Sequence, residues 1–174
     1  MFAIMALLNI VKYGEQILEQ TAGPIRQIDD QVHQLASDML TTMHAASGVG
    51  LAAPQVGAGK RLIVVDLSEF KKPRDCHILI NPEIISSSGS VRDAEGCLSF
   101  PDMTVRVIRP ERVVVRAESL DGKRIEIEAE DLLARALCHE IDHLNGILFI
   151  NRMQTLRRNL FLRRIRRLRQ AGKW

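Results

Sequence analysis

The sequence predicts an α+β fold in a single domain, residues 1–174, with antiparallel strands around a central helix that carries His139–His143. Two observations predict it. The expected order of elements is a helix, several strands, a second helix and a terminal helix, whereas a parallel sheet needs strands and helices that alternate. Asp121–Gly122 is also a hairpin pair, which joins antiparallel neighbours. Hydrophobic residues make up 46% and charged residues 26% of the chain, as in ordinary globular domains.

The first helix is expected from Asp29 or Asp30, either of which can cap it, to about Ala46. Gly48 and Gly50 then break the helical pattern. Apolar residues recur at helical spacing in this segment: Val32, Leu35, Met39, Leu40 and Met43.

Strands are expected where short apolar or alternating runs end near turn residues, namely 61–66, 77–80, 105–108, 113–117 and 125–128. The polar stretch Lys71–Asp75 is expected to be a loop. A second helix begins at Glu130 or Asp131 and runs through Leu144, with Gly146 beyond its end. A third, basic helix spans about 154–170, with its apolar positions at Leu156, Leu160, Ile165 and Leu168.

Composition favours a cytoplasmic protein with reduced thiols. No stretch approaches the roughly 20 apolar residues of a membrane span. The apolar run Met1–Val11 lacks the preceding positive charge and the cleavage site of a secretory signal, although Met5 leaves a second possible translation start. The chain has three cysteines, a small and odd number that argues against a disulfide framework.

The strongest local signal is His139-Glu140-Ile141-Asp142-His143. Residues four apart share one face of a helix, so both imidazoles can bind one metal ion. Glu140 is rotated by about 100° from His139 and can reach a metal-bound water without being a ligand. Asp142 is expected either to orient groups near the ligands or to be a solvated carboxylate.

A catalytic ion needs a third protein ligand, and Cys97 is the best candidate. It lies in Glu95-Gly96-Cys97-Leu98-Ser99, after a Ser/Gly-rich stretch that we interpret as a loop. The other candidates are the carboxylates and the remaining histidines, His33, His44 and His77. Cys138 is interpreted as core or pocket lining, and Cys76 as unimportant.

The segment Gly48-Val49-Gly50-Leu51-Ala52-Ala53-Pro54-Gln55 is built from small residues, which let another backbone or a peptide approach closely. It lacks the Lys-Ser/Thr ending of a phosphate-binding loop. The amide of Gln55 could donate a hydrogen bond to a developing oxyanion. By itself this segment also fits a plain loop.

Together these three segments, 48–55, 95–99 and 139–143, resemble the signature motifs of the peptide deformylase family, in order and at the usual spacing. The resemblance covers nearly the whole chain. It implies a metal-dependent hydrolase that removes the formyl group from the N-terminal methionine of newly made polypeptides and releases formate. It further implies ferrous iron as the ion, with nickel, cobalt or zinc able to substitute.

The resemblance also implies a role for each site residue. Metal ligands are Cys97, His139 and His143. The base is Glu140, and the oxyanion is stabilised by Gln55 and the Leu98 backbone N–H. Substrate contacts are expected from Val49, Gly50, Leu132, Arg135 and Ala136. Glu95 should pair with Arg109. The chain departs from the family at Cys138, often Gln, and at Asp102, often Gly, which puts pocket shape and loop conformation in doubt.

Two other functions remain open. An HExxH peptidase usually takes a third ligand downstream, yet no His, Glu or Asp follows His143. The second is a nucleic-acid-binding protein without enzymatic activity, which would bind through residues 151–174. These residues carry nine Lys or Arg and no Asp or Glu, whereas the rest of the chain carries 15 basic and 21 acidic residues. The basic helix is expected either to pack on the acidic body as a solvated helix or to bind the ribosome, as the basic C-terminal helix of some deformylases does. Neither DNA nor a membrane is expected as a partner.

Overall fold

The computed structural model describes residues 6–68 and 76–174. Its helices within these residues are α1 (Asp30–Ala45), α2 (Asp131–Leu144) and α3 (Thr155–Gln170), with the 3-10 turns η1 (Gln16–Glu19), η2 (Ala53–Val56) and η3 (Phe149–Arg152). Its strands there are β1 (Gly50–Ala52), β2 (Leu62–Asp66), β3 (Cys76–Ser88), β4 (Val91–Cys97), β5 (Phe100–Arg109), β6 (Arg112–Glu118) and β7 (Arg124–Glu130). The predicted α+β class is confirmed.

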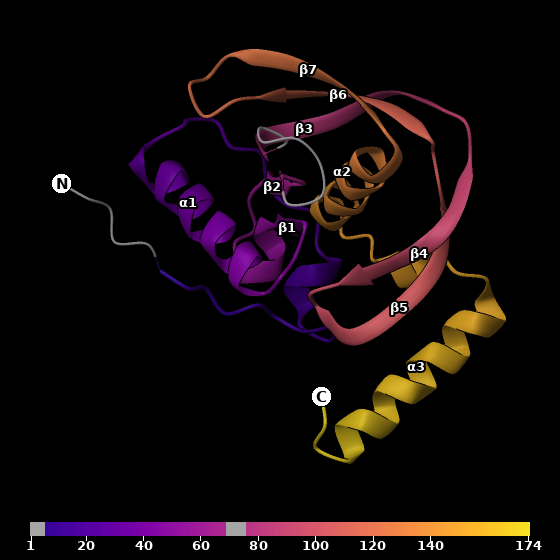
Figure 1. Ribbon diagram of the computed structural model, residues 1–174. Helices are drawn as coiled ribbons and strands as arrows, with labels where there is room; N and C mark the ends of the chain where they lie inside the picture. The colour runs from indigo at the N-terminus through magenta and orange to yellow at the C-terminus, as the bar shows by residue number, and fades with distance from the viewer. Residues whose placement is uncertain (1–5, 69–75) are drawn as a thin grey trace.

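All strand pairs are antiparallel. One sheet has the order β1-β2-β3-β6-β7, and β4 and β5 form a separate hairpin. Helix α2 lies between the larger sheet and this hairpin (Figure 1). Every residue from Ala136 to Leu144 is buried, as a helix covered on all sides requires. The HExxH segment is therefore central in the molecule.

The first helix begins as expected, because the Asp29 side chain accepts a hydrogen bond of 3.0 Å from the Val32 backbone N–H. Its buried side chains, among them Met39 and Met43, belong to the same core as Leu62 and Val64 of β2. Helix α1 ends at Ala45, and β1 then pairs with β2. The glycine-rich segment is thus fixed by a sheet rather than being a plain loop.

Two strand predictions were too short: β3 runs over Cys76–Ser88 instead of 77–80, and β5 over Phe100–Arg109 instead of 105–108. The prediction of a loop before Cys97 was wrong, because the Ser/Gly-rich stretch forms the end of β3, a turn at Gly89 and strand β4. Cross-strand pairing with β6 and β5 overrides the weak strand preference of serine and glycine. The expected loop Lys71–Asp75 and the two possible starts, Met1 and Met5, lie outside the described residues.

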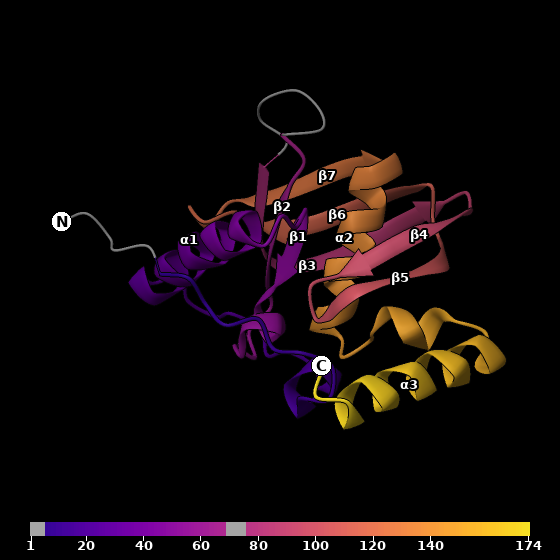
Figure 2. The same cartoon turned by 60° about the horizontal axis from the view of Figure 1, so that its bottom comes forward.

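Helix α3 lies beside the β4–β5 hairpin (Figure 2). Its packed side chains are Phe161, Ile165 and Leu168, which join a cluster around Phe100 and Phe149. The expected apolar face was partly wrong, because Leu156 is 74% and Leu160 56% exposed. Among the described residues, no helix is both long and apolar enough to cross a membrane.

Candidate metal centre and active site

Three ligand atoms converge where β4 ends against α2. Cys97 Sγ lies 3.3 Å from His143 Nε2, which in turn lies 3.2 Å from His139 Nε2. Ligand atoms roughly 3.3–3.6 Å apart follow from tetrahedral geometry with ordinary metal–nitrogen and metal–sulfur bond lengths. These side chains therefore fit one metal ion. Within residues 6–68 and 76–174, no other group of three His, Cys, Asp or Glu side chains converges in this way.

The other histidines considered as ligands do not join this group. His44 at the end of α1 forms an ion pair of 2.8 Å with Asp66 instead. Cys138 is buried with its pKa raised by burial to about 11, and it is not part of the metal group. Sequence reasoning therefore chose the cysteine that the fold brings to the histidines.

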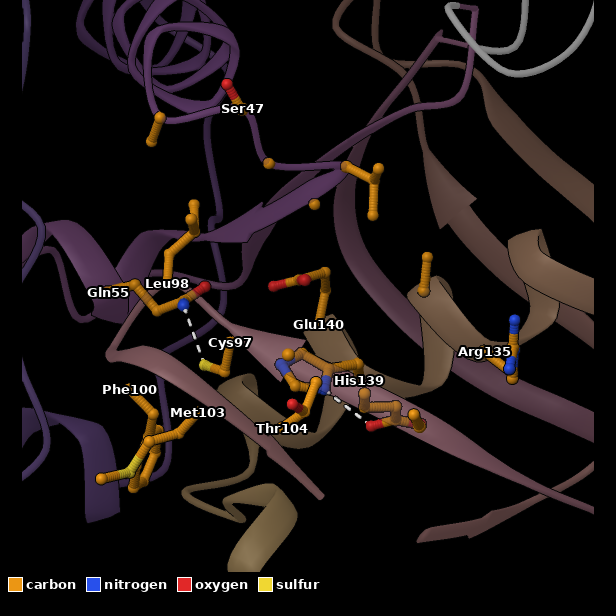
Figure 3. A pocket seen from close by; sticks show the side chains of 18 of the residues that line it. Ser47, Gln55, Cys97, Leu98, Phe100, Met103, Thr104, Arg135, His139 and Glu140 are labelled. Atoms are coloured by element: carbon orange, nitrogen blue, oxygen red, sulfur yellow. Dashed lines mark hydrogen bonds and ion pairs between the residues drawn. The ribbon is translucent and has the colours of Figure 1, made fainter. Parts of the chain in front are cut away.

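Glu95 orients one ligand ring. His139 Nδ1 donates a hydrogen bond of 3.0 Å to Glu95 Oε2, which leaves His139 Nε2 facing Cys97 and His143 (Figure 3). Arg109 donates two hydrogen bonds, of 2.8 and 3.0 Å, to the same carboxylate. The expected pair of Glu95 and Arg109 is thus in place, and it fixes the direction of the His139 ring.

Asp142 acts on this site through Arg109. The buried Asp142 carboxylate accepts a hydrogen bond of 2.5 Å from Arg109 and two, of 2.6 and 2.5 Å, from Arg152. Two carboxylates and two guanidinium groups thus balance one another beside the metal group. The sequence gave no hint of Arg152, because it is one of eight arginines in a uniformly basic tail.

Burial and charge shift the ionisation of these groups. Burial raises the pKa of Glu95, but hydrogen bonds from His139 and Arg109 outweigh it and hold that pKa at about 2. Burial, together with the positive charges of His139 and Arg109, lowers the pKa of His143 well below its ordinary value, which favours the neutral imidazole that binds a metal. Burial raises the pKa of Glu140 to about 7.

Glu140 is placed to exchange protons with a bound molecule. Its carboxylate is buried, and its Oε2 has no hydrogen-bond partner among the described residues. Such a group implies a water or ligand partner. The carboxylate lines the cavity and is directed toward the side on which Gln55 and Leu98 lie (Figure 3). A divalent ion nearby would lower its pKa, because the positive charge favours the carboxylate form.

A cavity of about 820 Å³ opens over this centre. All of the other expected site residues line it, namely Val49, Gly50, Gln55, Leu98, Leu132, Arg135 and Ala136. Gln55 Oε1 accepts a hydrogen bond of 2.8 Å from the Ala52 N–H, which directs Nε2 toward Cys97 Sγ at 3.6 Å. The glutamine amide is therefore held with its donor facing the reaction centre.

Arg135 and Asp102 also line the cavity. Arg135 forms an ion pair with Asp93, so its guanidinium is held at the cavity wall. Asp102, the position that put the loop conformation in doubt, has a left-handed backbone with φ 57°. Aspartate tolerates this region better than most residues. The departure from the family is therefore compatible with the same turn.

Comparisons with known proteins agree on one family. Residues 7–159 match the family model described as polypeptide deformylase. The chain is 49% identical to a peptide deformylase of Acidobacterium capsulatum, with 98% of this chain and all of that protein aligned. Its fold matches the crystal structure of a peptide deformylase from Legionella pneumophila at 40% identity, with a TM-score of 0.88 and coverage of 96% and 98%.

A second solved structure, of a peptide deformylase from Synechococcus elongatus in complex with actinonin, matches at 42% identity and a TM-score of 0.82, with 90% of this chain and 85% of that chain covered. The family model and the curated relative each extend far beyond the three motifs, so the match includes the strands and the packing helices. The chain belongs to the peptide deformylase family.

Proposed function

We propose that this protein removes the N-formyl group from the N-terminal methionine of newly made polypeptides and releases formate. One observation carries the proposal: a Cys-His-His ligand set lies beside a buried carboxylate whose Oε2 lacks a partner among the described residues, at the base of a cavity wide enough for a peptide end. A peptidase that takes a downstream acidic or histidine ligand does not fit this set, because Cys97 occupies that place.

Cys97, His139 and His143 would hold one divalent ion, which we propose is ferrous iron. Zinc, nickel and cobalt suit the same donor atoms. When bound, the ion supplies Lewis acidity toward water and toward the formyl oxygen. The Glu95 carboxylate keeps His139 in the ligating orientation.

Glu140 accepts a proton from the attacking water and donates it to the departing amine. The amide of Gln55 and the backbone N–H of Leu98 stabilise the negative charge that develops on the formyl oxygen. Both residues line the cavity beside Cys97, and the Gln55 amide is already oriented by Ala52. Their donors need little rearrangement as the charge forms.

The substrate is positioned from both sides of the cavity. The backbone of Val49 and Gly50 aligns the peptide, while Leu132 and Ala136 on α2 provide apolar contacts for the methionine side chain, beside Arg135. Gly50 lets β1 approach Glu140 of α2 closely, and Gly48 does the same toward Leu98 and Met43, so no side chain from these two positions fills the space beside the backbone.

The test is formate release from a formyl-Met peptide. A chelator should abolish release, and ferrous, nickel or cobalt ion should restore it, with metal analysis showing about one ion per chain. Full activity in a rigorously metal-free sample contradicts the proposal. So does a metal-loaded protein that leaves the formyl group intact but cleaves internal peptide bonds.

We further propose that the protein acts in the cytoplasm and docks on the ribosome through α3, where its substrate emerges. Exposed arginines of α3, such as Arg163, Arg166 and Arg167, suit RNA phosphates. Changing these three to Gln should abolish salt-sensitive co-sedimentation with ribosomes. The matched control changes three exposed arginines of β6 and β7, Arg112, Arg116 and Arg124, to Gln. Wild-type protein that stays in the supernatant at low salt contradicts docking.

A further inference from the structure

A second groove, of about 410 Å³, lies between the β4–β5 hairpin and α3. Among its lining residues, Arg152 belongs to the charge network described above and Phe161 to the core cluster that α3 joins. Its wall is formed from four elements, with Arg92 on β4, Arg106 and Ile108 on β5, Met153 after η3, and the α3 residues Arg157, Leu160, Phe161 and Arg164. Figure 2 shows α3 running below the hairpin, with the segment that leads into α3 between them at one end.

The groove combines positive charge with apolar surface. Arginines line it from several sides, and no Asp or Glu is among its lining residues. Ile108 is 60% exposed and Leu160 is 56% exposed, although both are large apolar side chains. Water-exposed apolar groups beside cationic groups are typical of a binding surface. The expected occupant is a chain that carries both carboxylates and apolar side chains.

The groove and the active-site cavity adjoin at Thr104, which lines both. On the outward face of the hairpin, three cross-strand pairs follow one another: Gly96 with Thr104, Ala94 with Arg106, and Arg92 with Ile108. The first pair belongs to the cavity and the last to the groove. Ile108 lies four residue steps along the strand from Thr104, about 13 Å, a distance that an extended peptide also covers in about four residues.

We propose that this groove binds the downstream segment of the polypeptide whose formyl end occupies the active site, and that it favours acidic side chains about five to nine residues after the methionine. The proposal rests on the deformylase function above, because that substrate is a polypeptide that must leave the cavity. Arg92, Arg106, Arg157 and Arg164 supply the charge, and Ile108 and Leu160 supply the apolar contact.

Other occupants fit less well. A second copy of this chain would bring the same arginines against one another, so the face repels itself. A nucleic acid would satisfy the arginines with its phosphates but leave Ile108 and Leu160 in water, since a phosphate backbone offers them little apolar surface. A polypeptide offers carboxylates and apolar side chains together, and Thr104 connects it to the site where its first residue reacts.

The experiment measures kcat/KM for formate release by the metal-loaded protein, without ribosomes. The reference substrate is formyl-Met-Ala-Ser. Three longer peptides begin in the same way and differ only at about five to nine residues after the methionine, where Leu alternates with Glu, with Gln or with Lys. We expect the Glu peptide to exceed the Lys peptide by roughly tenfold at low salt, because several half-exposed ion pairs each contribute a few-fold. Added salt should shrink this ratio.

Arg106→Glu combined with Arg157→Glu should reverse the ratio of Glu to Lys peptides. The matched control is Arg26→Glu combined with Arg124→Glu, which makes the same change in net charge on exposed residues outside the groove and should keep the wild-type ratio.

Equal kcat/KM for the Glu, Gln and Lys peptides overturns the proposal, and so does a control pair that reverses the ratio as strongly as the groove pair. Loss of activity on formyl-Met-Ala-Ser by the wild-type protein would instead count against the deformylase function itself.

Discussion

Gly50 lies directly against the carboxylate of Glu140. A methyl group at Gly50 would sit 2.4 Å from Glu140 Oε1 and 2.9 Å from its carboxyl carbon, closer than any real side-chain contact allows. Strand β1 and helix α2 therefore approach each other at the point where the proposed base is held. Glycine at position 50 is needed for the space it leaves rather than for a special backbone angle.

Gly50→Ala should lower kcat by about 10²-fold while leaving the metal bound, because the new methyl group pushes Glu140 out of place and a displacement of about 1 Å has that cost. Formate release and metal analysis on the same sample check this. Gly59→Ala is the control, since nothing lies within 4 Å of a methyl group there. An unchanged kcat in Gly50→Ala contradicts the close packing.

Glu140→Ala and Cys97→Ala should fail in different ways. Glu140→Ala should keep its metal and lose about 10²–10⁴-fold in rate, because a general base is removed but no ligand. Cys97→Ala should lose metal during dialysis. The role assignment is wrong if Glu140→Ala turns over like wild type, or if Cys97→Ala retains its ion.

Arg109→Met should destabilise the fold by about 3–5 kcal/mol, because Glu95 and Asp142 would lose the buried cation between them. Urea unfolding of the two proteins measures the difference. Arg116→Met is the matched control, since its ion pair with Glu126 is about half exposed on both sides and such pairs contribute about 0–1 kcal/mol. Equal losses in the two variants would refute the importance of burial.

Stability should fall in acid because of Glu95. Its pKa of about 2 in the folded protein lies below the ordinary value of 4.5, so its contribution is fully present above about pH 4.5 and is lost as the pH falls toward 2. A shift of this size corresponds to about 3 kcal/mol. Urea unfolding of wild type and Glu95→Gln at several pH values tests this. The variant should lack most of that decline, and parallel curves would contradict the assignment.

The iron form should lose activity in air faster than a nickel form. Ferrous iron and the Cys97 thiolate are both open to oxidation, and Cys97 is only half-buried at the cavity. Half-lives of the two metal forms, measured in air and under argon, test this. Equal half-lives in all four conditions would refute it.

The helices were easier to predict than the strands, because helical signals are local. The Asp29 cap and the His139–His143 spacing are set by residues within one or two turns, and both appear in the structure as expected. The length of β3 depends on pairing with β6, whose partners are far away in sequence. The sequence alone does not reveal how far along such a stretch a distant strand will pair with it.

The site residues show the same contrast between local and distant signals. His139 and His143 could be predicted from their spacing on one helix, and Cys97 from the unusual sequence around it. The salt bridge from Arg152 to Asp142 could not be foreseen, because a basic tail offers many arginines and only the fold selects one. The exposed Leu156 and Leu160 were also missed, since helical spacing alone does not say which of two apolar faces meets the body.

The charge network beside the metal group has a consequence for how the enzyme is made. Its four members come from β4, β5, α2 and η3, so the last of them, Arg152, is synthesised long after Cys97. Until then Asp142 has only Arg109 as a cation, and Glu95 must share that guanidinium with it. The three ligands are therefore complete only once His143 has been made, and the charge network that supports them only nine residues later, at Arg152.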